Sequence, residues 1–408
     1  MIGIVLIFIS MSLGVLFEIS VGSMNYNFEF IEPVLITVFI YIIIHLWNKN
    51  KYHKIPGPVV MMLLLLLIMF SYSLFSLSWT NYGLSVLPGS IVFFYGVISI
   101  FIANYYFQKN SNIYIIVSRL FVLIIIIQLF VNIYQGIDAG VTGFYDLKDY
   151  ARTLIGKSNF ISIFIAFDLI YEFISKDKHW IIFLLIDLVA IIFTISRGAI
   201  VTVVLALGVF FIVAMFNKNF NRKSILISIS LLIVIFITFM LVTSPGRELL
   251  KGLSAGLGAN TVSTRQVLWK EAFSETMANP MGVGIVWRND PHNFIFSSLR
   301  NLGFVFGTLY ILIIASPLFL LLHPIVLRLS KKSIGLLIAY LSVFIHSFIE
   351  VFYFTKLSVS WSMFTIVFIF IMVMKDIKEV NAMDNSLKKY GMNNNVFNKI
   401  KPQAGEES

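Results

Sequence analysis

Long uninterrupted apolar runs constrain this chain more than any other feature. Residues 59–70 and 122–127 carry no polar side chain at all. Only 12% of the 408 residues are charged, whereas a soluble domain carries roughly 25%. One globule cannot bury so much apolar surface, and a lipid bilayer is its natural solvent. The sequence therefore predicts an all-α polytopic membrane protein.

The number of spanning segments follows from their length, because crossing a bilayer takes roughly 20 apolar residues. This rule predicts about twelve transmembrane helices. They begin near Ile2, Ile31, Pro58, Val86, Ile113, Asn159, Trp180, Gly198, Ser224, Gly303, Ser333 and Val359. We expect a transmembrane helical domain over residues 1–375 and a polar cytoplasmic tail over residues 376–408.

The net charge of +10 is distributed as a topology signal rather than as a nucleic-acid surface. Lysines and arginines gather in every second connection between apolar segments. This pattern predicts that those connections and both termini lie in the cytoplasm. We therefore expect a multi-pass protein of the cytoplasmic (inner) membrane. The long connection 244–293 is an exception, because it carries several arginines on the outer side. The absence of cysteine excludes disulfides, thiolate metal sites and a cysteine nucleophile.

The outer connection 244–293 contains its own helix signal. Ser263 and Gln266 have the spacing of a capping box, and an amphipathic helix is predicted over residues 264–278. Arg265 falls in its first turn, where free N–H groups and a guanidinium suit a phosphate. The alternative for Arg265 is an ion pair with Glu248 or Glu271, or an approach to lipid phosphates.

Further basic residues and a histidine accompany Arg265 on the outer side. The arginines are Arg197, Arg247 and Arg288. His292 follows them directly before an apolar run, and its side chain suits a general base for a sugar hydroxyl. A structural role in the turn is the alternative for His292.

Several charged or titratable residues fall inside predicted spans, where they are costly unless they face the bundle interior. They are Glu18, Arg119, Asp168, Glu172, Asp187, Arg300, His346 and Glu350. His346 and Glu350 are one helical turn apart and could line one outer cavity. The outer connections show no metal-ligand motif and the chain shows no Walker motif, so we expect no cofactor and no metal.

An ordered set of motifs resembles the bacterial O-antigen polymerase and ligase superfamily, the Wzy and WaaL type of membrane glycosyltransferase. The motifs cover about residues 196–350. They are Ser196-Arg197-Gly198-Ala199, Arg265 ahead of Trp269 and Ala272, Asn279-Pro280-Met281-Gly282-Val283-Gly284, His292-Asn293-Phe294 with Leu299, Gly303 and Gly307, and His346 to Glu350.

The resemblance implies a GT-C-like fold with one large outer loop, and glycan transfer from an undecaprenyl-pyrophosphate carrier. His292 and Arg265 would be catalytic. The substrate-binding residues would be Arg197, Arg247, Arg288, Asn293 and Glu350, and Glu350 is the reserve candidate for the base. The implied function is metal-independent polymerisation of lipid-linked oligosaccharide repeat units into O-antigen, capsule or exopolysaccharide. The expected partners are membrane lipids, a flippase and a chain-length regulator. We expect no nucleic-acid partner.

Three alternatives stay open. A ligase of the same family would transfer finished polymer to another acceptor. A lipid-linked oligosaccharide flippase or other transporter would also have about twelve spans, but the sequence shows no internal repeat and no broken-helix signal. A scaffold for polysaccharide assembly would perform no chemistry.

Overall fold

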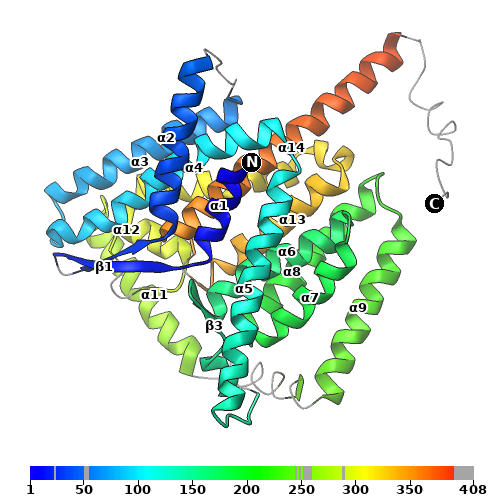
Figure 1. Cartoon of the computed structure of the whole chain (residues 1–408), viewed down its shortest axis with the longest axis horizontal. Helices are drawn as coiled ribbons and strands as arrows, with labels where there is room; N and C mark the ends of the chain where they lie inside the picture. Colours follow the sequence, from blue (N-terminus) through cyan, green and yellow to red (C-terminus); the bar gives the residue numbers. More distant parts are fainter. Residues whose placement is uncertain are drawn as a thin grey trace.

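The protein is described by a computed structural model that covers residues 1–22, 24–49, 55–144, 146–243, 246–247, 250, 260–286, 290–350 and 352–389. It is mainly a bundle of helices (Figure 1). The first nine helices are α1 (Ile2–Met11), α2 (Ile31–Lys49), α3 (Gly57–Phe75), α4 (Leu87–Lys109), α5 (Ile113–Asp138), α6 (Ser158–Ser175), α7 (Trp180–Phe193), α8 (Arg197–Phe216) and α9 (Arg222–Val242). They are followed by α11 (Asn260–Ala278), α12 (Phe294–Ala315), α13 (Lys331–His346) and α14 (Lys356–Lys389).

Short elements connect these helices. The 3₁₀ turns are η1 (Ser76–Ser78), η2 (Gly83–Val86), η3 (Asp146–Asp149), η4 (Ser316–Leu322) and η5 (Pro324–Arg328). Two antiparallel strand pairs also occur, β1 (Val15–Val21) with β2 (Met24–Glu29), and β3 (Arg152–Thr153) with β4 (Gly156–Lys157).

Helix length and composition identify a polytopic membrane protein. Eight segments within the described ranges are long and apolar enough to cross a membrane, and α1 and α7 are shorter apolar helices. The predicted all-α class is thus supported by the structure, while the count of twelve spans and the GT-C-like fold stay predictions.

The core lies where α6 packs along α13 and α14 packs along α4. Nearly every residue of α6 is buried. Trp361 of α14 meets Phe164 and Phe167 of α6 edge-on, with ring centroids 5.1 and 5.0 Å apart. Aromatic pairs of this geometry stabilise a core beyond their buried area, so α6 is held firmly on both sides.

A paired charge crosses the interface between α5 and α6. The Nε of Arg119 and the Oε1 of Glu172 are 2.7 Å apart, and Nη2 and Oε2 are also 2.7 Å apart. This two-bond geometry is the strongest form of such a pair. Arg119 and Glu172 thus satisfy each other's charge within the bundle.

The prediction for Glu18 was wrong, because residues 15–29 form a β-hairpin rather than part of a span. The hairpin lies along one edge of the bundle in Figure 1. Phe17 pairs with Phe28 and Ile19 with Tyr26, so these four side chains share one face. Glu18 lies on the other face, where its Oε2 accepts from Asn25 at 3.5 Å. The hairpin is thus amphipathic.

A buried ion pair fixes the end of this hairpin to α14. Lys356 Nζ is 2.5 Å from Glu32 Oε1, and both side chains are almost inaccessible to solvent. Lys356 also donates to the Asn27 carbonyl, and the Tyr95 hydroxyl donates to Glu32 Oε2 at 2.6 Å. Every oxygen of the carboxylate is therefore used, as a buried charge requires.

Helix α12 is broken at Gly303, which has φ +74°. The segment before it, Met281–Gly284, runs beside the break: Val283 N donates to Arg300 O at 3.0 Å, and Gly284 N donates to Asn301 O at 3.0 Å. The expectation of no broken helix is wrong at this position. The freed carbonyls are satisfied by protein backbone, so the break serves packing between two segments of the chain.

Two boundaries differ from their predictions. The predicted helix over 264–278 corresponds to α11, which begins at Asn260, so Ser263 lies inside the helix and is not its N-cap. Helix α14 continues through Lys389 and extends beyond the bundle in Figure 1, so the first part of the predicted tail is helical. Residues 390–408 of that tail lie outside the described residues.

Candidate functional site

The imidazole of His292 faces a carboxylate contributed by a distant part of the chain. His292 Nδ1 and Glu350 Oε1 are 3.4 Å apart, an ion-pair distance rather than a closely aligned hydrogen bond. The His292 side chain is 43% exposed and that of Glu350 is 20% exposed. One ring nitrogen therefore faces the protein while the ring stays accessible to a substrate.

Local backbone geometry aims His292 at this position. Its φ of +48° lies in the left-handed region, which is uncommon for residues other than glycine. An Asx turn supports that conformation, because His292 N donates to Asp290 Oδ1 at 2.8 Å. Strained backbone of this kind is concentrated at functional sites.

The two partners shift each other's titration in opposite directions. The facing carboxylate of Glu350 raises the pKa of His292, against the effects of burial and of the Arg265 charge. Burial raises the pKa of Glu350, but the facing His292, together with His346 and Asn159, outweighs it and leaves that pKa below its ordinary value. Both shifts favour an imidazolium–carboxylate pair.

Glu350 is held in place by the first turn of α6 and the start of α8. Asn159 Nδ2 donates to Glu350 Oε2 at 3.3 Å, and Ser196 Oγ donates to Asn159 Oδ1 at 3.1 Å. Ser196 also caps α8 by accepting from Ala199 N at 3.4 Å. This chain of contacts brings the segment that carries Arg197 to the pair of His292 and Glu350.

Gly198 allows close packing of the same turn. A Cβ at this position would lie 3.0 Å from Ile349 Cδ1 and 3.6 Å from His346 Cε1. His346 is buried at the end of α13, and Glu350 N donates to its carbonyl at 3.1 Å. Helix α13 thus ends at His346, so the prediction that Glu350 lies inside this helix is wrong, although the two residues do share one neighbourhood.

Helix α11 is fastened to the turn that carries His292 by Trp269. Its Nε1 donates to the Pro291 carbonyl at 2.8 Å, and its ring stacks on Phe296 with centroids 5.8 Å apart. Arg265 precedes Trp269 by four residues and therefore lies on the same face of α11. Its charge acts on His292 and on Lys148, so Arg265 belongs to this site.

A lysine that the sequence analysis did not select joins the two arginines. Lys148 is half-buried in η3, between α5 and α6. Burial first, and then the positive charges of Arg197 and Arg265, lower its pKa. No signal in the sequence distinguishes Lys148, because residues 136–158 hold as many acidic as basic side chains.

We name Lys148, Arg197, Arg265, His292 and Glu350 the basic site. Its members come from η3, α8, α11 and the connections before α12 and after α13. Three cationic side chains around an imidazole and a carboxylate can bind a polyanion beside a group that accepts a proton.

The other predicted site residues lie elsewhere or have structural partners. Asn293 caps α12, since its Oδ1 accepts from Ile295 N at 2.9 Å and from Phe296 N at 3.2 Å. Its Nδ2 donates to Phe348 O at 3.0 Å. Arg247 donates to the carbonyls of Leu241 and Val242 at the end of α9. Arg288 lies outside the described residues.

In the described part of the chain, no group of three or more His, Asp or Glu side chains is arranged to hold a metal ion.

The described helices indicate a polytopic membrane protein, and the basic site lies where α6 and α8 begin and α13 ends. Residues 182–311 match the family model described as O-antigen ligase. This match supports the predicted resemblance to the O-antigen polymerase and ligase superfamily over that range. The range includes Arg197, Arg265 and His292, whereas Lys148 and Glu350 lie outside it. No curated protein matches the chain.

Proposed function

We propose that this protein polymerises oligosaccharide repeat units carried on undecaprenyl pyrophosphate, at the outer face of the cytoplasmic membrane. The observation that carries the proposal is the pair of His292 and Glu350, set beside Arg197 and Arg265. Three of these four residues fall in the range that matches the O-antigen ligase family. The alternation of basic connections along the sequence supports the orientation.

The proposed reaction is a direct displacement at the anomeric carbon of the donor sugar. Glu350 faces Nδ1 of His292, so Nε2 is the nitrogen offered to the acceptor hydroxyl. As the acceptor oxygen bonds to the anomeric carbon, its proton passes to Nε2. The bond between that carbon and the pyrophosphate oxygen breaks, and the electron pair leaves with the lipid pyrophosphate. Inversion at the anomeric carbon follows.

Glu350 supports this step by electrostatics. It fixes the ring orientation of His292 and stabilises the imidazolium that forms, as the third member of a base relay does. Asn159 in turn fixes Glu350. The carboxylate needs no proton of its own in this scheme.

The cationic side chains stabilise the departing phosphates. A pyrophosphate carries several negative charges, and arginine offers a planar fork that matches phosphate oxygens. Arg197, Arg265 and Lys148 come from three different elements, so they can surround the leaving group. Donors preorganised where charge develops contribute about 10²–10³ in rate each.

The second candidate is a ligase that transfers finished polymer to another acceptor. The description of the matching family, O-antigen ligase, favours it, and the same basic site would serve. The two candidates differ in the acceptor, so the test must measure chain length.

The deciding experiment is the size distribution of lipid-linked saccharides in cells that lack this protein. Accumulated single repeat units support the polymerase. Long lipid-linked chains that never reach their acceptor identify the ligase, and units trapped on the cytoplasmic face identify a flippase.

Variants connect that result to the site. Arg265→Ala and His292→Gln should abolish product at normal protein abundance, while Arg265→Lys should retain a fraction because it keeps the charge without the fork. Arg222→Ala, an exposed arginine at the start of α9, is the matched control. Normal product from both Arg265→Ala and His292→Gln would refute the assignment of the basic site.

A further inference from the structure

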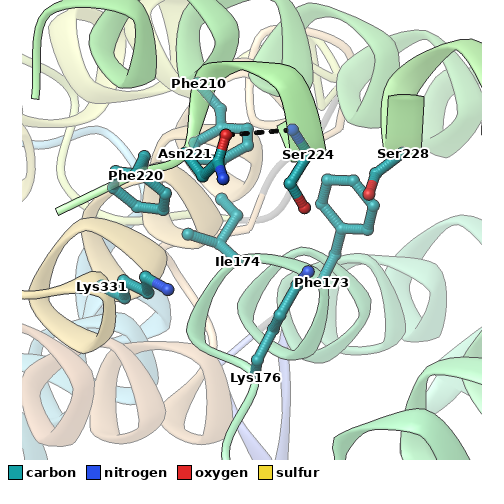
Figure 2. Close-up of a pocket in the computed structure, with 9 residues that line it drawn as sticks. All are labelled: Phe173, Ile174, Lys176, Phe210, Phe220, Asn221, Ser224, Ser228 and Lys331. Carbon is teal, nitrogen blue, oxygen red and sulfur yellow. Dashed lines mark hydrogen bonds between the residues drawn. The ribbon is translucent and has the colours of Figure 1, made fainter. Parts of the chain in front are cut away.

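A small, mainly apolar cavity with polar side chains at its rim opens between the ends of α6, α9 and α13 (Figure 2). Its volume is about 60 Å³. It is lined by Phe173, Ile174, Lys176, Phe210, Phe220, Asn221, Ser224, Ser228 and Lys331. We name it the lysine pocket.

The lysine pocket lies at the opposite end of the helices that build the basic site. Lys331 begins α13 and His346 ends it, which separates them by roughly 22 Å at 1.5 Å per residue. Lys176 follows the last residue of α6, whereas Asn159 lies in its first turn. The pocket is therefore independent of the proposed reaction.

Two ammonium groups reach into this pocket from different elements. Figure 2 shows Lys176 and Lys331 on two sides of the pocket, with Ile174 between them. Lys176 Nζ is 5.2 Å from the Trp180 ring centroid and Lys331 Nζ is 5.8 Å from that of Phe220. Within the described part of the chain, neither lysine has a carboxylate at ion-pair distance, whereas the neighbouring Lys332 is 2.8 Å from Asp177. Two cations that line one pocket favour an anion there.

The backbone conformation at Lys176 is a second, independent observation in favour of this site. This residue is the C-cap of α6 and has φ +52°, a left-handed conformation that glycine normally supplies at a helix end. A lysine here strains the backbone and places an ammonium at the pocket. Ser224 lies in the first turn of α9, where the N–H groups of Lys223 and Ser224 donate to Asn221 Oδ1 at 3.1 and 3.4 Å, so this helix offers the serine hydroxyl rather than its backbone to the pocket.

The walls of the pocket identify a lipid as the source of the anion. Phe173, Phe210 and Phe220 form an apolar floor. Beyond the pocket, α9 exposes Leu226 and Leu231, and Figure 1 shows this helix standing at the edge of the bundle. Acyl chains can lie along that surface while a phosphate sits on the lysines. Basic pockets between membrane helices bind anionic headgroups in this way.

We propose that the lysine pocket binds the phosphodiester headgroup of an anionic membrane lipid and thereby holds α9 against α6 and α13. Lys176 and Lys331 neutralise the phosphate. Ser224, Ser228 and Asn221 donate hydrogen bonds to it or to the polar alcohol of the headgroup.

The test uses the full chain in bilayers of phosphatidylcholine alone or with phosphatidylglycerol. We expect phosphatidylglycerol to raise the midpoint of thermal unfolding and to remain bound in native mass spectrometry. The variant Lys176→Gln with Lys331→Gln should weaken the apparent affinity by roughly tenfold or more. Lys218 is an exposed lysine in the connection between α8 and α9 and does not line the pocket. Lys218→Gln should therefore behave as the wild type.

Each other outcome overturns the proposal or a defined part of it. Equal binding of phosphatidylglycerol by the double variant removes the lysines from the site. An equal effect of inorganic phosphate removes the lipid as the ligand. If the double variant does not fold, two single variants replace it. Lys331→Arg should retain the binding of phosphatidylglycerol, and Ser224→Val should weaken it. Weaker binding by Lys331→Arg than by Ser224→Val contradicts the assignment.

Discussion

Asn159 donates to Glu350 at 3.3 Å across 191 residues of sequence, and this contact joins the start of α6 to the carboxylate that orients the proposed base, His292. The same amide accepts from Ser196, the cap of α8. One side chain thus sets the spacing between the carboxylate that orients His292 and the helix that begins with Arg197.

Asn159→Ala should therefore lower kcat/KM by roughly tenfold, because a hydrogen bond to a charged group contributes about 1.5–3 kcal/mol. It should also raise the pKa of Glu350, which the Asn159 amide helps to lower. Both effects are measured as the rate of donor consumption against pH in purified membranes. Asn219→Ala, which removes a donor to Leu329 O instead, is the control. An unchanged pH profile in Asn159→Ala would contradict a positioning role.

The pH dependence separates His292 from Glu350 as the base. A base must be deprotonated, so the rate should fall as the pH drops through the raised pKa of His292. Glu350→Gln removes the main group that raises this pKa. The acid limb should then move to lower pH, with a lower maximal rate, in a profile recorded over the neutral and acidic range. If Glu350 is the base, Glu350→Gln instead abolishes transfer at every pH.

Part of the site was accessible from sequence because its residues lie in ordered motifs. Arg197, Arg265 and His292 could be selected by their positions beside helix starts, and the structure places them in one neighbourhood. Asn159 and Lys148 could not, because their role depends on contacts between segments distant in the chain. Asn293 was selected for the same motif as His292, but its amide is used to cap α12.

The hairpin over residues 15–29 shows where the pattern itself was misread. Apolar Phe17, Ile19 and Val21 alternate with Glu18 and Ser20, which is the period of a half-exposed strand rather than of a span. The high overall hydrophobicity hid that alternation. The break of α12 at Gly303 gave no local signal, because it depends on the backbone of Met281–Gly284 packing beside it.

That break predicts different fates for two glycines in helices. Gly303 has φ +74°, and a Cβ there would lie 2.3 Å from the Pro280 carbonyl oxygen. Gly303→Ala should therefore destabilise the protein severely and reduce its abundance in membranes. Gly208 in α8 has no atom within 4 Å of such a Cβ, so Gly208→Ala should be neutral or stabilise by about 0.5–1 kcal/mol. Unfolding midpoints in detergent measure both, and equal tolerance would mean that the backbone at Gly303 can rearrange.

The ion pair of Glu32 and Lys356 should behave as a buried unit rather than as two separate contributions. Lys356→Met leaves a carboxylate with almost no solvent contact, and it should cost about 3–5 kcal/mol. Glu32→Gln combined with Lys356→Met should recover much of that loss, since Gln keeps an acceptor for the Tyr26 and Tyr95 hydroxyls.

The pair of Lys332 and Asp177, 2.8 Å apart and more accessible to solvent, provides the comparison. Lys332→Met should cost at most about 1 kcal/mol, because solvent screens that pair. Chemical unfolding of the four proteins in the same detergent gives the free-energy differences. Should the double variant at Glu32 and Lys356 be as unstable as Lys356→Met alone, the pair is fastening the hairpin to α14 through its charge and not only through its hydrogen bonds.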